Sequence, residues 1–356
     1  MQSSQSGSTA GESSKPIGQT AKAKPKRYGF LLVPNYSLIA FASAIEPLRM
    51  ANWITGDELY ETTLISHDGE AVASSFGVQT LVNYGLDDLP ELDAIFVCGA
   101  SPIARTGNDA IIAWLRQQRS NKIAIGGIGT GSYILACAGL LNNHKATIHW
   151  WDIDSLREDF PHTQVTNNLF EIDDKRYTCS GGTAAMDMML FLIRQQHGME
   201  LAASISEQFV CERIRTGDDP QRIPLKTRIG ASQPKLIEAV QLIEANIEEP
   251  LSADDLARHV GVSRRHLERL FKKHLQTVPS KYYLELRLEQ ARKLLRQSDK
   301  PILQVGLACG FASASYFSTA YRNHYGLTPR EERKRLQEQE SSSPSYPVVT
   351  QRSQLI

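Results

Sequence analysis

Two similar segments in the last third of the chain constrain its fold more than any other feature. In the first, a short helical pattern stops at Gly261, and Ser263 can cap the helix that follows. In the second, a short apolar face precedes Gly310, and Ser313 can cap the next helix. Residues 282–296 between them have the spacing of one amphipathic helix. The pattern predicts two helix-turn-helix units joined by a rigid helix.

The charge of this region differs from that of the remaining chain. Residues 251–335 hold 17 Lys and Arg against 8 Asp and Glu, although the formal net charge of the whole chain is +0. A basic third joined to an acidic remainder favours a nucleic-acid-binding module attached to a domain with another task. A helical bundle with a basic face and no nucleic-acid partner is the alternative.

The second unit carries a specific sequence signature. Residues 310–317 read GFASASYF, Tyr321 and Arg322 follow, and residues 326–329 read GLTP. The region from about 235 to 335 resembles the DNA-binding domain of the AraC/XylS transcription regulators. The resemblance implies an all-α module with two helix-turn-helix units that read an asymmetric half-site of duplex DNA.

The second helix of a helix-turn-helix reads the major groove with its amino-terminal residues. We expect Arg265 and Arg269 to read guanine, and Lys272 and Lys273 to contact phosphate. The second reading helix carries few basic residues, so its contacts are expected to be weaker or apolar. The candidate DNA contacts are Arg264, Arg265, His266, Arg269, Lys272, Lys273, Ser313, Ser315, Tyr316, Thr319 and Arg322.

The first two thirds of the chain alternate short apolar runs with helical patterns. The expected strands are residues 28–33, 62–66, 94–98 and 122–126. The expected helices are residues 43–52, 110–118, 132–140 and 184–194, with a further helix ending near Arg215. This alternation predicts an α/β domain whose parallel sheet is sandwiched by helices. Ligands of such sheets bind outside the carboxyl ends of the strands.

One strand-to-helix turn carries a second resemblance. Residues 123–131 read IAIGGIGTG, and such a strand, sharp turn and helix expose the nucleophile of many α/β enzymes. Residues 127–150 resemble the ThiJ/PfpI, class I glutamine amidotransferase-like superfamily, which implies a flavodoxin-like fold. Residues 41–52 and 213–224 are similar to its GlxA-type branch, in which this domain is fused to an AraC/XylS DNA-binding domain.

The position of the nucleophile, a Cys in the enzymes of this superfamily, falls on Gly129, while its supporting acid and His fall on Glu46 and His149. Glycine has no side chain and supplies no thiolate. Cys98 is expected to be a buried apolar residue, and Cys137 lies a helical turn or more beyond the elbow. We therefore expect no catalytic residue, and binding without turnover.

The same loops predict a ligand site. Free backbone N–H groups around Gly129, Thr130 and Gly131 could hold a carboxylate, and Trp150 or Trp151 could offer a ring to a cation. Glu46 either faces a cationic group or is a buried structural acid, and His149 either contacts the ligand or makes a structural hydrogen bond. The candidate ligand contacts are Asn35, Glu46, Ala100, Ser101, Gly129, Thr130, His149, Trp150 and Trp151. The resemblance implies a betaine-like quaternary amine, carnitine or a basic amino acid, with no cofactor and no metal.

The resulting plan has five parts: a disordered arm at 1–27, a ligand-sensing domain at 28–215, a linker at 216–232, the double helix-turn-helix domain at 233–335 and a disordered tail at 336–356. No apolar run approaches the roughly 18 residues that cross a bilayer, the arm does not read as a signal peptide, and five irregularly spaced cysteines favour the cytoplasm.

Three functions remain open. The first is a ligand-responsive transcription regulator, an activator that dimerises through its sensor domain, binds promoter DNA and contacts RNA polymerase. The second is a ThiJ/PfpI-type hydrolase or deglycase tethered to DNA, which Gly129 argues against. The third is a nucleoid-associated protein without a ligand.

Overall fold

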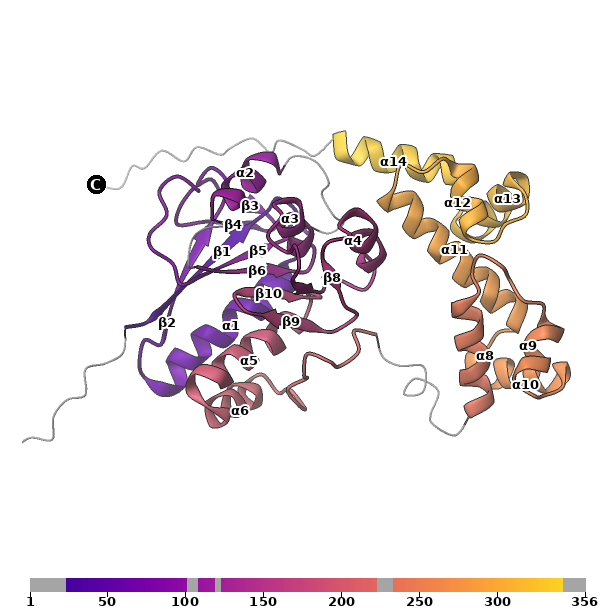
Figure 1. Ribbon diagram of the computed structural model, residues 1–356, viewed down its shortest axis with the longest axis horizontal. Helices are drawn as coiled ribbons and strands as arrows, with labels where there is room; N and C mark the ends of the chain where they lie inside the picture. Colours follow the sequence, from indigo (N-terminus) through magenta and orange to yellow (C-terminus); the bar gives the residue numbers. More distant parts are fainter. Residues whose placement is uncertain (1–23, 101–107, 119–122, 223–232, 342–356) are drawn as a thin grey trace, which may run out of the picture.

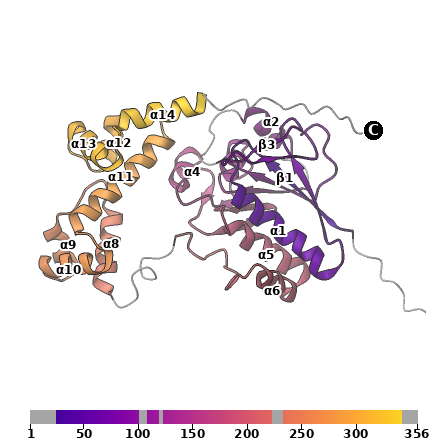
Figure 2. The same cartoon turned by 180° about the vertical axis from the view of Figure 1, so that it is seen from behind.

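A computed structural model describes residues 24–100, 108–118, 123–222 and 233–341 of the protein. An α/β domain at the amino-terminal side is followed by a wholly helical domain, and the two lie side by side (Figures 1 and 2). None of the helices in these ranges is long and apolar enough to span a lipid bilayer.

The α/β domain is built on a six-stranded sheet with the order β2-β1-β5-β6-β10-β9. All neighbouring strands run parallel except β9, which is antiparallel to β10. The strands are β1 (Lys26–Leu32), β2 (Tyr60–Ile65), β5 (Ala94–Cys98), β6 (Ala124–Ile128), β9 (Phe170–Asp173) and β10 (Arg176–Cys179). The strand order reverses between β1 and β5, where open α/β sheets form their ligand crevice. The expected flavodoxin-like parallel sheet is confirmed.

Two short two-stranded ribbons accompany the main sheet. One pairs β3 (Val72–Ala73) with β4 (Gln79–Thr80), and the other pairs β7 (Lys145–Ala146) with β8 (Gln164–Val165). The sequence did not predict these ribbons or the β9–β10 hairpin, because the strands are short and mostly half-buried, with little apolar pattern.

Helices cover both faces of the main sheet, and the alternation of side chains along each strand fills both layers. Phe30 and Leu32 belong to one buried cluster with α1 and α5, whereas Leu31 and Val33 belong to the other, with α2, α3 and α4. The helices of this domain are α1 (Leu38–Thr55), α2 (Asp109–Gln117), α3 (Gly131–Cys137), α4 (Ile153–Asp159), α5 (Ala184–His197) and α6 (Met199–Gln208).

The helical domain consists of two small cores joined by one long helix, α11. Its amino-terminal part packs with α8, α9 and α10, and its carboxyl-terminal part packs with α12 and α13. The helices are α8 (Pro234–Ala245), α9 (Ala253–His259), α10 (Arg264–Leu275), α11 (Pro279–Gln297), α12 (Ile302–Ala308), α13 (Ala314–Tyr325) and α14 (Pro329–Ser341). Both helix-turn-helix units and the rigid connection are as the sequence predicted. The helix α14 continues to Ser341, so the expected start of the disordered tail at 336 is too early.

The chain does not leave the α/β domain at residue 215. Arg213 forms an ion pair of 2.7 Å with Asp219, whose carboxylate also accepts hydrogen bonds from Thr216. Gln221 Nε2 lies within hydrogen-bond distance of three acceptors on other loops, among them the Thr147 hydroxyl at 3.0 Å and the Asn168 carbonyl at 2.8 Å. Residues 211–222, here called the exit segment, therefore belong to the α/β domain, and the boundary at 215 is too early. The rest of the expected linker, 223–232, lies outside the described residues, as does the arm up to residue 23.

The two domains are in direct contact through α4 and the end of α11. Lys293 on α11 forms an ion pair of 2.8 Å with Asp154 on α4, and only 8% of the Lys293 side chain is exposed. A second pair joins Lys300 to Glu158 at 3.4 Å, with both side chains exposed. The helix α4 thus lies between the helical domain and the loops at the carboxyl edge of the sheet (Figure 2).

Candidate functional site

The first reading helix, α10, buries one face and exposes the other. Ser263 caps it by accepting a hydrogen bond from the His266 N–H, and Leu267 and Phe271 are buried in the core. Arg264 does not point freely into solvent, because its guanidinium pairs with Asp254 at 3.0 Å and with Glu268 at 2.9 Å. The pair with Asp254 links α10 to α9, and Arg264, whose side chain is 55% exposed, stays a predicted DNA contact.

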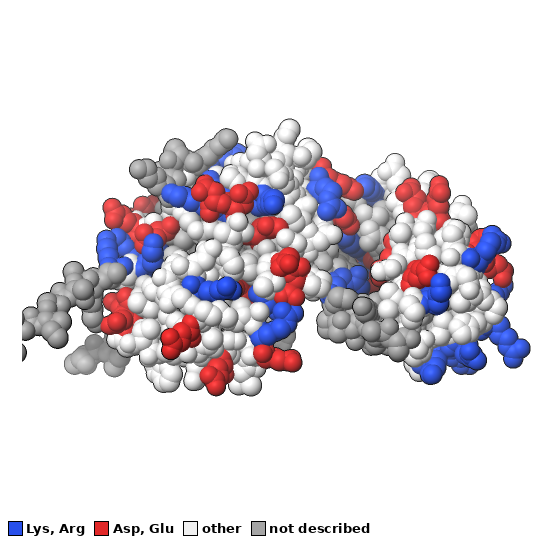
Figure 3. Space-filling view, turned by 60° about the horizontal axis from the view of Figure 1, so that its bottom comes forward, with Lys and Arg blue, Asp and Glu red and all other residues white. Residues whose placement is uncertain are grey.

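The other basic side chains of α10 are exposed. The Arg269 Nη2 and His266 Nδ1 atoms are 3.0 Å apart, while Arg265, Lys272 and Lys273 form no ion pair in the described part of the chain. With Ser263 and Val278 these residues line one shallow hollow. Blue side chains gather along the lower edge of the helical domain in Figure 3. A strip of this kind suits the negatively charged edge of a DNA groove.

The second reading helix, α13, repeats this geometry with fewer charges. Ser313 accepts a hydrogen bond from the Tyr316 N–H, and Phe317 and Tyr321 are buried. Its expected contacts are all exposed: Ser313, Ser315, Tyr316, Thr319 and Arg322. The structure therefore gathers the two sets of candidates on two capped and exposed helices.

A residue that the sequence did not single out fixes the second unit to the connecting helix. Arg287 on α11 donates hydrogen bonds to the carbonyl oxygens of Cys309 at 2.7 Å and Gly310 at 2.6 Å. Its guanidinium also lies 4.2 Å from the ring centroid of Phe311. These contacts hold the turn before α13 and thus set the position of the second reading helix relative to α11.

The candidate ligand site is a cavity of about 380 Å³ at the carboxyl edge of the sheet. Loops that follow β1, β5, β6, β7 and β10 meet there, at the reversal in strand order, and the exit segment adds Arg215 and Gln221. The lining residues are Ser37, Ile39, Ala40, Gly99, Ala100, Gly129, Thr130, His149, Trp150, Asp152, Ser180, Gly181, Gly182, Thr183, Ala184, Arg215 and Gln221. Five expected contacts are among them: Ala100, Gly129, Thr130, His149 and Trp150.

Gly129 has the backbone of a nucleophile elbow without a nucleophile. Its φ of +59° lies in the left-handed region, yet a Cβ placed there would meet nothing closer than the Cα atom of Gly181 at 3.7 Å. The Gly129 N–H donates to the Cys179 carbonyl at 3.0 Å, and the Thr130 hydroxyl donates to the Ala100 carbonyl. The expected carboxylate cradle at this turn is therefore wrong at Gly129, because that N–H group is already used by the sheet.

The cysteines near the cavity are not poised for reaction. Cys98 and Cys179 end β5 and β10, and both are fully buried. Burial raises the pKa of the Cys98 thiol far above its ordinary value and raises the pKa of Cys179 to about 11. Thiols that stay protonated near pH 7 are poor nucleophiles.

His149 and Trp150 form the wall of the cavity nearest the helical domain. Burial, and then the positive charge of Lys293, lower the pKa of His149 below its ordinary value, which favours the neutral ring. The Nδ1 atom of His149 accepts a hydrogen bond of 3.3 Å from the Trp151 N–H. Trp150 carries the Arg222 guanidinium 4.7 Å from its ring centroid, so one face of this ring already contacts a cation.

Among the described residues, three expected ligand contacts do not line this cavity: Asn35, Glu46 and Trp151. The Glu46 carboxylate pairs with Arg49 at 2.7 Å along α1, and Asn35 is exposed. Trp151 lines a second cavity, of about 570 Å³, between the two domains, and Ser101 lies outside the described residues. Trp150 and Gln221 line both cavities.

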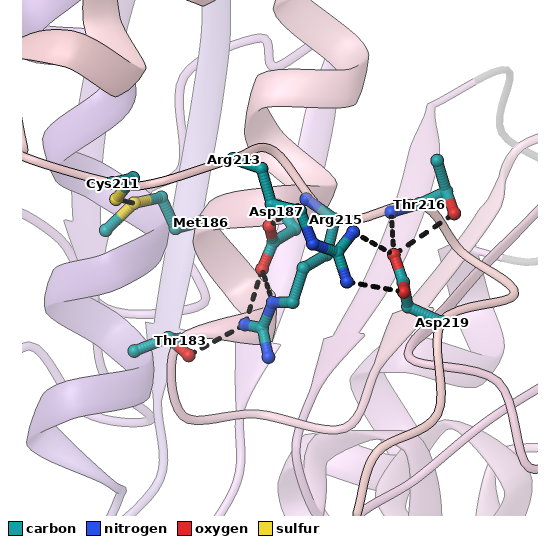
Figure 4. A network of polar contacts seen from close by, with 8 residues as sticks. All are labelled: Thr183, Met186, Asp187, Cys211, Arg213, Arg215, Thr216 and Asp219. Carbon is teal, nitrogen blue, oxygen red and sulfur yellow. Dashed lines mark hydrogen bonds and ion pairs between the residues drawn. The ribbon is translucent and has the colours of Figure 1, made fainter. Parts of the chain in front are cut away.

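The sequence did not single out a polar network on one side of the cavity (Figure 4). Asp187 on α5 is buried and accepts hydrogen bonds from the Arg215 backbone N–H at 2.8 Å and side chain at 2.6 Å. Thr183 accepts a further bond of 2.8 Å from Arg215. Roughly thirty residues separate the partners along the chain, and only the resemblance of residues 213–224 pointed to this segment.

Comparison with known proteins agrees with this division. The DJ-1/PfpI family model matches residues 30–195, and a helix-turn-helix domain model matches residues 256–335. The chain is 48% identical over 309 residues to the HTH-type transcriptional regulator GbdR of Pseudomonas aeruginosa, covering 87% of this chain and 84% of that one. It is 38% identical over 315 residues to the regulator GlxA of Rhizobium meliloti, covering 87% of this chain and 96% of that one.

The chain belongs to this family of AraC-type regulators with a DJ-1/PfpI domain. A crystal structure of an AraC family transcriptional regulator from Pseudomonas putida is 30% identical, covers 52% of this chain and all of that one, and has a TM-score of 0.49. The protein is a DNA-binding transcription regulator of the helix-turn-helix type.

Proposed function

We propose that the α/β domain is a sensor that binds a small zwitterion or cation without turning it over, and that the bound state activates transcription from promoter DNA. The observation that carries the proposal is the cavity at the reversal in strand order, which has glycine where its fold relatives with enzyme activity have a nucleophile. The alternative of a DNA-tethered hydrolase or deglycase finds no reactive thiol at this cavity among the described residues, because Cys98 and Cys179, which precede its lining residues, are both buried.

The chemistry of the cavity supports the ligand class. Trp150 offers a ring that already contacts the Arg222 guanidinium, and Asp152 adds an acidic side chain. A quaternary amine such as glycine betaine or carnitine, or a basic amino acid such as arginine, carries a cation of the kind that these side chains attract. The volume of about 380 Å³ suits a ligand of this size.

We also propose that two copies pair through the α/β domain, and that the helical domain contacts RNA polymerase at the promoter in the cytoplasm. The ribbon of β3 and β4 supports pairing, because Phe76 is 89% exposed and Leu81 is 81% exposed. Large exposed apolar side chains are typical of protein interfaces where they form a patch. Two linked DNA-binding domains gain affinity when their half-sites are correctly spaced.

Calorimetry of the full chain against glycine betaine, carnitine and arginine tests the ligand class. A dissociation constant in the micromolar to millimolar range for one of them, with ligand-dependent binding to the protein's own promoter, is the expected result. Binding of only a sugar or an aromatic acid would discard this ligand class. Amidase or glyoxalase activity that persists in the Cys98→Ala and Cys137→Ala variants would reassign the α/β domain as an enzyme.

A further inference from the structure

Arg215 is held rigidly at the wall of the cavity. Asp187, which is only 6% exposed, accepts hydrogen bonds from the Arg215 Nε at 3.0 Å and Nη2 at 2.6 Å, and Thr183 accepts a second one from Nη2. The guanidinium plane is therefore fixed from one side before any ligand arrives. A fixed guanidinium loses little entropy when it binds an anion.

The opposite side of this guanidinium remains available. Arginine has five N–H donors, and these contacts use the one on Nε and both on Nη2. The Nη1 atom has no hydrogen-bond partner in the described part of the chain, and no dashed line reaches it in Figure 4. The Arg215 side chain is 31% exposed and lines the cavity, so water reaches it now and a ligand can replace that water.

We propose that Arg215, which Asp187 and Thr183 hold in position, binds the carboxylate of the effector. The inference rests on the proposed function of the cavity and narrows its ligand to molecules with a carboxylate. An incoming carboxylate meets Nη1 on the side away from Asp187, and the Thr183 hydroxyl, which also lines the cavity, can donate a second hydrogen bond. Charge-assisted hydrogen bonds of this kind are among the strongest in ligand sites.

The position of Arg215 along the chain gives this residue a second role. It lies on the exit segment, which precedes α8 of the helical domain in the chain, with residues 223–232 between them outside the described residues. Gln221 on the same segment lines both the ligand cavity and the cavity between the domains. A ligand that binds Arg215 therefore restrains the same stretch of chain that carries the DNA-binding domain. A ligand that binds more tightly to one position of this segment than to another would couple ligand binding to DNA binding.

The role of Arg215 is tested with pairs of compounds in which only one member carries a carboxylate. The full chain is titrated by calorimetry with glycine betaine against choline, and with arginine against agmatine. For whichever pair binds, the carboxylate form is expected to bind roughly 10- to 100-fold more tightly. Equal affinity within that pair would overturn the role of Arg215 while leaving the sensor function intact, whereas silence towards every compound would reject the proposed ligand class itself.

A variant with a matched control tests the residue. Arg215→Gln is expected to weaken binding of the ligand with a carboxylate roughly 10- to 100-fold and to leave unchanged the affinity for the matched compound without a carboxylate, choline or agmatine. Arg213→Gln is the control, because Arg213 lies on the same segment, pairs with Asp219 and does not line the cavity. Its binding should equal that of the wild type. Equal binding by Arg215→Gln would refute the proposal.

The stability of the variant is controlled separately. Removing Arg215 leaves the buried Asp187 carboxylate without its partner, so the double variant Asp187→Asn, Arg215→Gln is measured beside the single one. Both variants are expected to bind the promoter without ligand as the wild type does, and to lose the response to the carboxylate ligand. A folded double variant that keeps this response would contradict the inference.

Discussion

Gly310→Ala is expected to damage the arrangement of the two reading helices more than the equivalent change in the first unit. Gly310 has a φ of +73°, and a Cβ there would lie 2.6 Å from the carbonyl oxygen of Ile247 and 2.8 Å from that of Glu248. These oxygens belong to the loop between α8 and α9, so the turn of the second unit packs against the backbone of the first. The left-handed conformation costs an alanine about 1–2 kcal/mol, and forcing the backbone apart adds about 1–3 kcal/mol.

Gly261→Ala is the internal control. Gly261 occupies the same place in the first unit with a φ of +69°, but the nearest atom to its added Cβ would be the Lys235 Nζ at 4.0 Å. This change is therefore expected to cost only the conformational part, about 1–2 kcal/mol. For a domain of about 100 residues, the difference between the two variants corresponds to a melting temperature at least about 4 °C lower for Gly310→Ala.

Calorimetric unfolding of the full chain and binding to the promoter measure the two consequences. Gly310→Ala should lower both the melting temperature of the helical domain and the affinity for the complete operator, since the second reading helix can no longer keep its position beside the first. Gly261→Ala should lower the melting temperature less than Gly310→Ala does, by the conformational part alone. Equal melting temperatures and equal operator affinities for the two variants would refute the packing argument.

Three further predictions concern other surfaces. Arg265→Ala should weaken operator binding by about 1–3 kcal/mol and relax specificity at one base pair, whereas Lys272→Ala should weaken binding to all DNA sequences alike and reduce the salt dependence of binding by about one ion. Band-shift assays on matched and mutated operators over a salt series separate the two effects. Identical behaviour of the two variants would reject the assigned roles. Lys293→Met should raise the pKa of His149 towards its ordinary value without reaching it, because burial is the larger cause; an unchanged NMR titration would show that Lys293 does not act on the ring. Phe76→Ser should weaken self-association in sedimentation equilibrium, and an unchanged dimer would place the interface elsewhere.

Local signals in the sequence predicted the parts of the fold that repeat a pattern. The capping serines Ser263 and Ser313 each accept the expected backbone hydrogen bond, because a cap depends on residues only three positions apart. The apolar runs at β1 and β5 are buried on both faces and therefore stand out in sequence. The β9–β10 hairpin is half exposed at the sheet edge, so its residues lack such a run.

The sequence predicted the location of the ligand site better than it predicted the residues that line it. Loops after parallel strands meet at one edge, which put Gly129 and His149 together as expected. Glu46 was assigned to the cavity by resemblance, yet its helix position allows the contact with Arg49, three residues on, and does not bring it to the lining. Arg215 and Gln221 come from the exit segment, whose return to the domain depends on contacts 32 and 74 residues away that no local pattern encodes.

The contact between the domains is small enough for a ligand to alter. Lys300 and Glu158 are exposed, and such a pair contributes about 0–1 kcal/mol. Lys293 is buried but its partner Asp154 is 53% exposed, so solvent offsets much of their attraction. Couplings between binding sites are typically about 1–3 kcal/mol, which is comparable to what these two pairs can supply. The helix that carries Asp154 follows His149 and Trp150 directly, so a ligand that shifts those two side chains is expected to act on the Lys293–Asp154 pair. A change in where the helical domain is held is therefore the response to the proposed effector that these contacts favour, since none of the described contacts covers the surfaces that read DNA.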